Sequence, residues 1–354
     1  MIDRIQHLKK SFQKNQLDGF IVADEINMIY LTGFDGAARL LIPAHGESLL
    51  YVYGVNYDAA KATAKNCNIE LLKRGEDANK KVADQCKRLK LKKIGFDNLD
   101  VASFLTIRKS LKKTKLKSEG QAIWDLRKVK DQTELRCIRK AAELTDEGAR
   151  AAVEAIKPGM REYEVAAEVE YAMRKRGSEG TAFDTILASG LRSAYPHGGC
   201  TAKKIRKGEL IQFDIGARYQ HYNADLTRTF LVGKPTPKQK RMYEVVMEAQ
   251  EEAFQRIREG VKGKQVDATA REIIEKHGFG ECFVHGLGHG VGLAVHEMPT
   301  LNQVSKDVLK AGNVVTNEPG IYIVGYGGVR IEDTVLVKKK VAERLTKSPY
   351  DLVV

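Results

Sequence analysis

Four carboxylates in the second half of the chain stand inside segments that otherwise have the apolar pattern of buried β-strands. Asp214 lies in LIQFDIGARY, and Asp225 lies in YNADLTRTFLV. Further along, Glu318 lies in VVTNEPGIYIV and Glu332 in GGVRIEDTVLVKK. Because a buried carboxylate without a partner is energetically costly, each acid must meet a cation or a strong hydrogen-bond network.

Two arrangements would supply those partners. Ion pairs to Arg228 or Arg330, which are close in sequence, would account for single acids. A cluster of divalent ions would account for all four, because Asp and Glu oxygens are the ligands that hard metals prefer and two divalent ions balance four negative charges. The sequence therefore favours a shared metal site, with an ion pair as the alternative for any one acid.

Histidines provide a second signal. The segment HGLGHGVGLAVHE contains His285, His289 and His296, with glycines at alternate positions that permit close backbone approach. This pattern predicts a sharp turn or strand beside a ligand, and it matches neither H-E-x-x-H nor G-x-G-x-x-G. His197, in AYPHGGC, is a fourth candidate.

The elements that precede these motifs predict a separate α/β domain. Apolar runs near residues 19–23, 38–43, 48–53 and 93–97 favour strands, and helical spacing of apolar residues marks residues 57–64 and 78–89. The polar stretch KKTKLKSEGQ then indicates an interdomain connection. We place the boundary near Gly120, which gives domains at 1–120 and 121–354.

The second domain combines helices with antiparallel strands. Breaker residues and apolar spacing predict a long helix that ends at Pro158-Gly159 and a further helix over Glu162–Lys175. Two alternating strands around Gln220 resemble a hairpin. Two more helices are expected at 238–259 and 266–277, followed by paired strands near the C-terminus. The whole chain is expected to be α/β in its first domain and α+β in its second.

The ordered motifs FDIGA, NADLTRT, HGLGH, NEPGIY and GGVRIED resemble those of dinuclear metallopeptidases with the pita-bread fold. Within that fold they are most similar to Xaa-Pro dipeptidases (prolidases) and aminopeptidase P. The resemblance covers essentially the whole chain, because those enzymes carry a creatinase-like α/β domain in front of the catalytic one. Methionine aminopeptidases share the ligand pattern but usually lack that front domain.

Carried over position by position, the resemblance implies two divalent metal ions. Asp214 would ligate one ion, and Asp225 with Glu332 would bridge both. The second ion would be completed by His289 and Glu318. Carboxylates with one imidazole favour Mn, with Co, Fe or Zn as alternatives.

The resemblance also implies the reaction, which is hydrolysis of the Xaa-Pro peptide bond by a hydroxide bridging the two metals. Glu318 would serve as general base. His296 and His197 match two histidines that flank the scissile bond, and Arg330 matches an arginine that supports the bridging acid. The expected substrate is a small peptide with proline at the second position.

The length of that peptide is left open. The resemblance implies that dipeptide-specific relatives hold the free carboxylate with an arginine upstream of the NEPG strand. In this chain no arginine lies between His296 and Arg330, where only Lys306 and Lys310 could substitute. A dipeptidase is the first expectation, and aminopeptidase P acting on longer Xaa-Pro peptides is the alternative. A non-catalytic pita-bread binding protein and a creatinase-type amidinohydrolase are disfavoured, because the complete ligand set is present.

Composition limits the partners. The formal net charge is +13, and 43% of residues are hydrophobic, which excludes a disordered chain. Eleven Lys and Arg against two Asp lie between Cys86 and Ser118 with few aromatics, which favours a solvated basic face over nucleic-acid binding.

Five scattered cysteines indicate reduced thiols, and no segment has the length of a membrane span. We therefore expect a cytoplasmic protein without nucleic-acid or membrane partners. The resemblance to the prolidase family also implies that the protein forms a homodimer.

Overall fold

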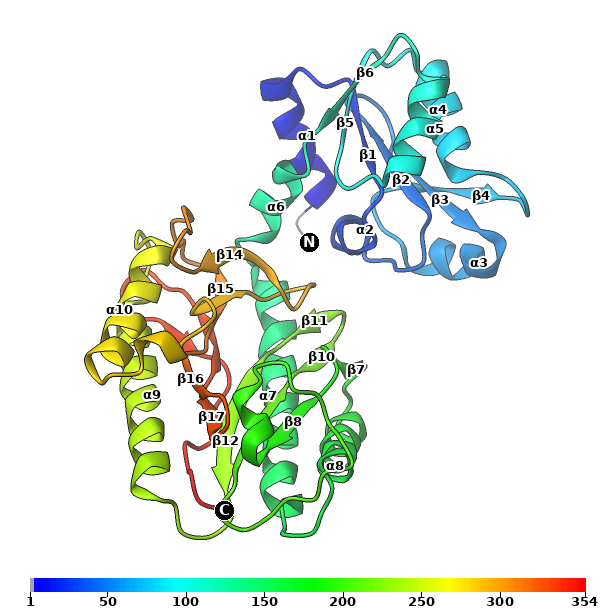
Figure 1. Cartoon of the computed structure of the whole chain (residues 1–354). Coiled ribbons are helices and arrows are strands. Elements are labelled where there is room, and N and C mark those ends of the chain that lie inside the picture. The colour runs from blue at the N-terminus through cyan, green and yellow to red at the C-terminus, as the bar shows by residue number, and fades with distance from the viewer. Residues whose placement is uncertain (1–2) are drawn as a thin grey trace. The chain divides into compact units, whose positions relative to one another are not determined.

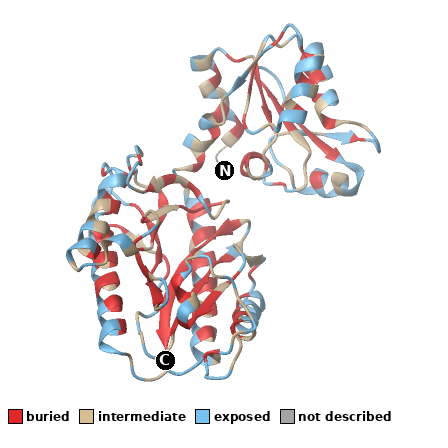
Figure 2. Cartoon of the chain, viewed as in Figure 1, coloured by how far each residue is buried: buried red, intermediate tan, exposed pale blue. Residues whose placement is uncertain are grey.

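The computed structural model describes residues 3–354, which divide into two compact units after Arg127 (Figure 1). In each unit the central strands are buried, whereas the edge strands β4 and β6 of the N-terminal unit are mostly exposed (Figure 2). The boundary placed near Gly120 from the sequence lies just before helix α6 (Gln121–Arg127), ahead of the division between the units. Within residues 3–354, no helix is both long and apolar enough to cross a membrane.

The N-terminal unit is a mixed six-stranded sheet in the order β4-β3-β2-β1-β5-β6. Its strands are β1 (Gly19–Val22), β2 (Arg39–Pro43), β3 (Leu49–Tyr53), β4 (Asn68–Leu72), β5 (Lys93–Phe96) and β6 (Lys115–Ser118). Its helices, besides α6, are α1 (Arg4–Asn15), α2 (Glu25–Thr32), α3 (Gly54–Thr63), α4 (Ala78–Arg88) and α5 (Val101–Ser110). The four predicted strands and two predicted helices of this unit are all present.

Local sequence explains where most of these helices begin. Helices α1, α2, α4 and α5 each follow an aspartate whose carboxylate accepts a hydrogen bond from the first turn: Asp3, Asp24, Asp77 and Asp100. The Lys-rich stretch that was expected to be a connection instead supplies β6, which pairs in parallel with β5 at the sheet edge. Its side chains are mostly exposed, so the strand lacks the apolar signal of a buried one.

The C-terminal unit contains four long helices and several small sheets. The helices are α7 (Gln132–Ala155), α8 (Glu162–Lys175), α9 (Pro237–Arg256) and α10 (Gly263–Lys276), with short 3₁₀ turns η1 (Gly190–Ala194) and η2 (Gly280–Cys282). The strands are β7 (Gly180–Thr181), β8 (Ile186–Ser189), β9 (Leu210–Ile215), β10 (Ala217–Tyr219), β11 (Tyr222–Asn223), β12 (Leu226–Leu231), β13 (Gly288–Gly290), β14 (Glu297–Leu301), β15 (Val314–Asn317), β16 (Gly320–Ile323), β17 (Gly327–Arg330), β18 (Asp333–Leu336) and β19 (Glu343–Arg344). Two buried apolar clusters join them, one beneath α7 and α8 and the other beneath α9 and α10.

The predicted hairpin is present and positions the first two acids. Strand β9 pairs antiparallel with β12, and β10 pairs with β11 across a turn at Gln220 and His221, whose φ angles are 47° and 66°. These left-handed values are those of a tight hairpin turn that matches the strand twist. In this register Asp214 lies opposite Thr227, and Asp225 lies just before β12.

The C-terminal strands form a second antiparallel ribbon that is interrupted once. Strand β15 pairs with β18 in a five-stranded sheet, and β16 pairs with β17 as a separate two-stranded sheet. Glu318 lies between β15 and β16, and Glu332 lies between β17 and β18. At these breaks the Glu318 N–H donates to the carbonyl of Leu287, and the Glu332 N–H to that of Thr227. The interruption therefore attaches both acids to neighbouring strands.

Candidate metal centre and active site

The structure gathers the predicted acids around one imidazole. Atoms of Asp225, His289 and Glu332 that could ligate a metal all lie within 4.8 Å of one another. His289 Nε2 is 3.2 Å from Glu318 Oε1 and 3.8 Å from Asp225 Oδ2. The other ring nitrogen of His289 lies 3.1 Å from the carbonyl of Gly290, which suits an Nδ1–H donor and directs Nε2 toward the acids.

Asp214 is linked to the same cluster by its ion pair with Arg330 and by the effect of its charge on Asp225. Its Oδ2 accepts a hydrogen bond of 2.5 Å from Arg330 Nη2, whereas its Oδ1 is buried and has no hydrogen-bond partner among residues 3–354. A buried carboxylate oxygen without a donor is costly unless a cation meets it. The donor set, four carboxylates and one imidazole, is the kind that divalent metals such as Mn²⁺ bind. These residues therefore fit the metal site that the sequence predicts.

Ion pairs alone do not account for the acids. Arg228 pairs with Asp333 at 3.0 Å and not with any of the four. In the described part of the chain, the ion pairs of the four carboxylates are with Arg330 and His289 only. One arginine and one histidine for four acids leave a net negative charge, which bound divalent ions would offset.

The pKa values of three of these carboxyl groups are raised by their burial close to one another. Burial, followed by the charge of Asp214, raises the pKa of Asp225 well above its ordinary value, and burial with the charge of Asp225 does the same to Glu332. Burial also raises the pKa of Asp214 against the opposing effect of Arg330. A cation held among these groups would lower all three.

Glu318 and His289 behave as a pair. Burial opposes both charges, but the hydrogen bond between them lowers the pKa of Glu318 to about 2 and raises that of His289 to about 9. Glu318 is therefore a carboxylate at neutral pH.

Two threonines that the sequence reasoning did not single out hold the glutamates. Thr227 Oγ1 donates to Glu332 Oε2 at 2.6 Å and accepts from Arg330 Nε at 3.0 Å. Thr316 Oγ1 donates to Glu318 Oε1 at 2.9 Å and accepts from the backbone N–H of His289. Arg330 thus pairs directly with Asp214 and reaches Glu332 through Thr227. The alternation of strand faces could have identified both threonines, because each lies two residues from a predicted ligand.

Replacing Thr227 by Val is expected to lower metal affinity about 10- to 100-fold, the usual cost of losing a hydrogen bond that orients a ligand. Valine has nearly the same shape but leaves Glu332 without its donor. Isothermal titration with Mn²⁺ measures the effect. Thr227→Ser keeps the hydroxyl and should retain most of the affinity, and equal losses in both variants would contradict this role.

The alternating glycines of HGLGHG let strands approach closely, as expected. A Cβ on Gly288 would lie 2.3 Å from the carbonyl oxygen of Thr316, and one on Gly290 would lie 2.4 Å from that of Met298. Real side chains do not tolerate such distances. The glycines therefore allow β13 to insert between β14 and β15 and bring His289 to the acids.

His296 lies beside this cluster, and His197 lies near His296. Both are exposed, in contrast to the buried Asp214, Asp225 and Glu332. The ring of His296 is 4.0 Å from that of His289, centroid to centroid. Burial and then the charge of His289 lower the pKa of His296, and His197 is near enough to contribute in the same direction. His296 is consequently a neutral imidazole at pH 7.

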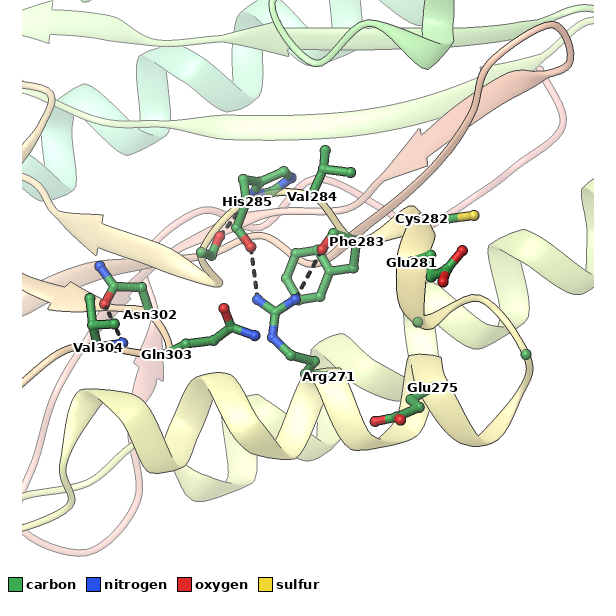
Figure 3. Close-up of a pocket in the computed structure, with 13 residues that line it drawn as sticks. Arg271, Glu275, Glu281, Cys282, Phe283, Val284, His285, Asn302, Gln303 and Val304 are labelled. Carbon is green, nitrogen blue, oxygen red and sulfur yellow. Dashed lines mark hydrogen bonds between the residues drawn. The ribbon is translucent and has the colours of Figure 1, made fainter.

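His285 lies behind the cluster. Its Nε2 is 2.9 Å from the hydroxyl of Tyr322, which also accepts a hydrogen bond from Arg330, so Tyr322 donates to His285. Burial lowers the pKa of His285, which suits this neutral acceptor. The residue also lines an open cavity of about 790 Å³ beside α10, where Arg271 donates to the carbonyls of Phe283 and His285 (Figure 3). His285 therefore supports the glycine turn and does not join the candidate ligands.

Comparison with known families agrees with this geometry. Residues 136–339 match metallopeptidase family M24, and residues 4–129 match the creatinase/prolidase N-terminal domain. The chain belongs to metallopeptidase family M24. This M24 peptidase therefore combines a creatinase-type N-terminal domain with a pita-bread catalytic domain, as the sequence motifs predicted.

The relatives of this M24 peptidase match it along its whole length. It is 41% identical to the Xaa-Pro dipeptidase of Pyrococcus horikoshii over 355 aligned residues, covering 100% of this chain and 99% of that protein. The crystal structure of the prolidase from the same organism superposes with a TM-score of 0.93 at 40% identity and covers 99% of this chain and 100% of that one. An X-Pro aminopeptidase from Thermotoga maritima superposes with a TM-score of 0.93 at 35% identity, covering 100% of both chains.

Proposed function

We propose that this M24 peptidase hydrolyses the Xaa-Pro bond of dipeptides, using two divalent ions held by Asp214, Asp225, His289, Glu318 and Glu332. The observation that carries the proposal is the buried cluster itself, in which burial and then mutual repulsion raise the pKa of Asp225 and of Glu332, and in which Asp214 Oδ1 lacks a donor within residues 3–354. Full-length similarity to Xaa-Pro dipeptidases supports the substrate class.

The ions would supply a nucleophile at neutral pH by lowering the pKa of water, and would polarise the peptide carbonyl. Manganese is the first choice for this oxygen-rich donor set, with Co, Fe or Zn as alternatives. Arg330 acts on the reaction indirectly, because it fixes Asp214 directly and Glu332 through Thr227.

Glu318 is suited to accept the proton of the attacking water. Its Oε1 accepts a hydrogen bond from Thr316 Oγ1, which leaves Oε2 to take the proton. Glu318 is a carboxylate at neutral pH, the form that a base requires. We assign it the role of general base in the proposed mechanism.

His296 and His197 are suited to handle the substrate. Neutral His296 can donate one N–H to the oxygen that becomes negative as the carbonyl is attacked. His197, which is also exposed, would orient the proline residue. A peptide bond to proline has no N–H, so the protein must recognise the ring by shape and not by a hydrogen bond.

Release of the N-terminal residue from longer Xaa-Pro peptides is the second candidate. The observation that favours it is the absence of an arginine between His296 and Arg330 that could hold a free proline carboxylate. Lys306 and Lys310 are exposed. The similarity to the Thermotoga X-Pro aminopeptidase supports the same alternative.

A direct assay separates the two candidates. The Mn-loaded protein is expected to hydrolyse Ala-Pro with a higher kcat/KM than Ala-Pro-Ala, and Ala-Ala serves as the control without proline. A clear preference for the tripeptide would replace the dipeptidase assignment with the aminopeptidase one. Fewer than one bound metal per chain after reconstitution, together with no hydrolysis of either peptide, would contradict both and leave a binding protein.

We further propose a homodimer that works in the cytoplasm without nucleic-acid or membrane partners. This proposal is supported by the resemblance to the prolidase family and by the solvated character of the basic stretch between Cys86 and Ser118. Light scattering coupled to size-exclusion chromatography measures the oligomeric state.

A further inference from the structure

A glutamate remote in sequence from every predicted ligand occupies an unusually well-satisfied site. Glu162 is the first residue of α8 and is 0% exposed. Its Oε1 accepts hydrogen bonds from Ser189 N at 2.8 Å and from Ser189 Oγ at 2.9 Å. Its Oε2 accepts from Thr201 N at 3.0 Å, from Thr201 Oγ1 at 2.6 Å and from Arg192.

These donors lie at the two ends of one loop. Ser189 ends β8 where the loop begins, and Thr201 lies at its other end, with His197 between them. The backbone reinforces the arrangement, because Tyr163 N donates to the Thr201 carbonyl. A single buried carboxylate therefore holds together both ends of the 189–201 loop.

The interior of the loop is held as well. Arg192, bound to Glu162, also donates to the Gly199 carbonyl at 2.7 Å. The carbonyl of Pro196, next to His197, accepts from Arg330 Nη1 at 3.1 Å and from Gln212 at 3.3 Å. His197 is thus fixed on one side to the arginine of the metal centre and on the other to Glu162.

We propose that Glu162 is a positioning residue for His197, an inference that rests on the proposed Xaa-Pro peptidase function. Glu162 does not touch the substrate. It acts by fixing the ends of the loop and thereby the place of the exposed imidazole near His296. The carboxylate form is required, because all five contacts come from donors and each oxygen must accept.

Glu162→Gln is the sharp test. The side chain keeps its size, but one oxygen becomes an NH₂ that faces N–H and O–H donors. Glu164→Gln is the matched control, since Glu164 lies in the same first turn but interacts with Arg161, through its N–H and, at 3.9 Å, its guanidinium, and not with the donors of Glu162. Displacement of a catalytic group by about 1 Å can cost about 100-fold. We expect kcat/KM on Ala-Pro to fall about 10- to 100-fold in E162Q, with metal content unchanged, and to stay near wild type in E164Q.

A double-mutant cycle distinguishes positioning from general damage. If Glu162 acts through His197, E162Q should add little to the loss already caused by H197A. The proposal would be overturned if the fold-loss of kcat/KM in the double variant equalled the product of the two single losses, or if E162Q had wild-type activity. Thr201→Val removes only the Oγ1 donor to Glu162 and is a milder variant. If E162Q does not fold, the double-mutant cycle of T201V with H197A tests the proposal in the same way.

Hydrogen exchange supplies a readout that needs no substrate. Amides of residues 190–201 should exchange faster in E162Q than in E164Q, while those of β9 and β12 stay protected. Failure of the wild type to cleave Ala-Pro would contradict the proposed function but leave this measurement valid. Unchanged exchange in E162Q would contradict the positioning role even in an active enzyme.

Discussion

Asp225→Asn is expected to abolish metal binding and hydrolysis together, with kcat/KM falling by about 1000-fold or more. Loss of the ions forfeits several kcal/mol of charge stabilisation in the transition state. Asparagine has the shape of aspartate, so the backbone bond from Asp225 N to Thr334 Oγ1 should persist. Glu332→Gln is expected to behave in the same way.

Stability should change differently from activity. Burial and the neighbouring Asp214 raise the pKa of Asp225, which means that the folded protein disfavours its ionised form. Removing that charge should therefore leave the melting temperature of the metal-free protein unchanged or higher.

Metal content per chain, kcat/KM and thermal melting test these expectations together. Asp146→Asn is the control, because Asp146 is a partly buried aspartate that accepts from Lys347 N and Ser348 N outside the metal centre. It should keep both metals. A D225N protein that binds two ions and hydrolyses Ala-Pro would refute the ligand role.

His296→Ala is expected to retain both metals and to lower kcat by about 100- to 1000-fold, the typical cost of removing one donor to a developing oxyanion. The side chain is exposed and lies beside His289 without taking part in the acid cluster. Its removal should therefore spare the ligands while leaving the attacked carbonyl oxygen without its donor.

Single-turnover kinetics and metal analysis on the same preparation check this result. His277→Ala is the matched control, since His277 interacts with Glu248 and Arg241 away from the metal centre. Metal loss in H296A would show that His296 is a ligand and not a catalytic group. Full activity would remove it from the mechanism.

The strand pattern predicted the acids of the site well, because a carboxylate inside an apolar run is a local anomaly. Asp214 and Asp225 were predicted to lie in a hairpin around Gln220, and the structure has that hairpin with its turn at the expected place. The alternating glycines around His289 likewise predicted a close approach that the structure contains.

The contacts that hold the site could not be predicted in this way, because they join residues far apart in sequence. Lys130 and Glu297 form a buried ion pair of 2.7 Å across 167 positions, next to His296. Glu162 at the start of a helix looks like an ordinary first-turn acid, although its partners are 27 to 39 residues away. Strand β6 was missed because an edge strand needs little apolar surface.

The interrupted ribbon of β15 to β18 restricts how the length of this chain can vary. Glu318 and Glu332 occupy facing breaks, so one residue inserted between Gly327 and Glu332 would turn the side chains of the intervening strand to the opposite face. At the ribbon's tip, Val324 is 79% exposed and Gly325 turns with φ of 80°. Insertions are therefore accommodated at this loop tip, whereas the four residues of β17 have a fixed length set by the metal centre.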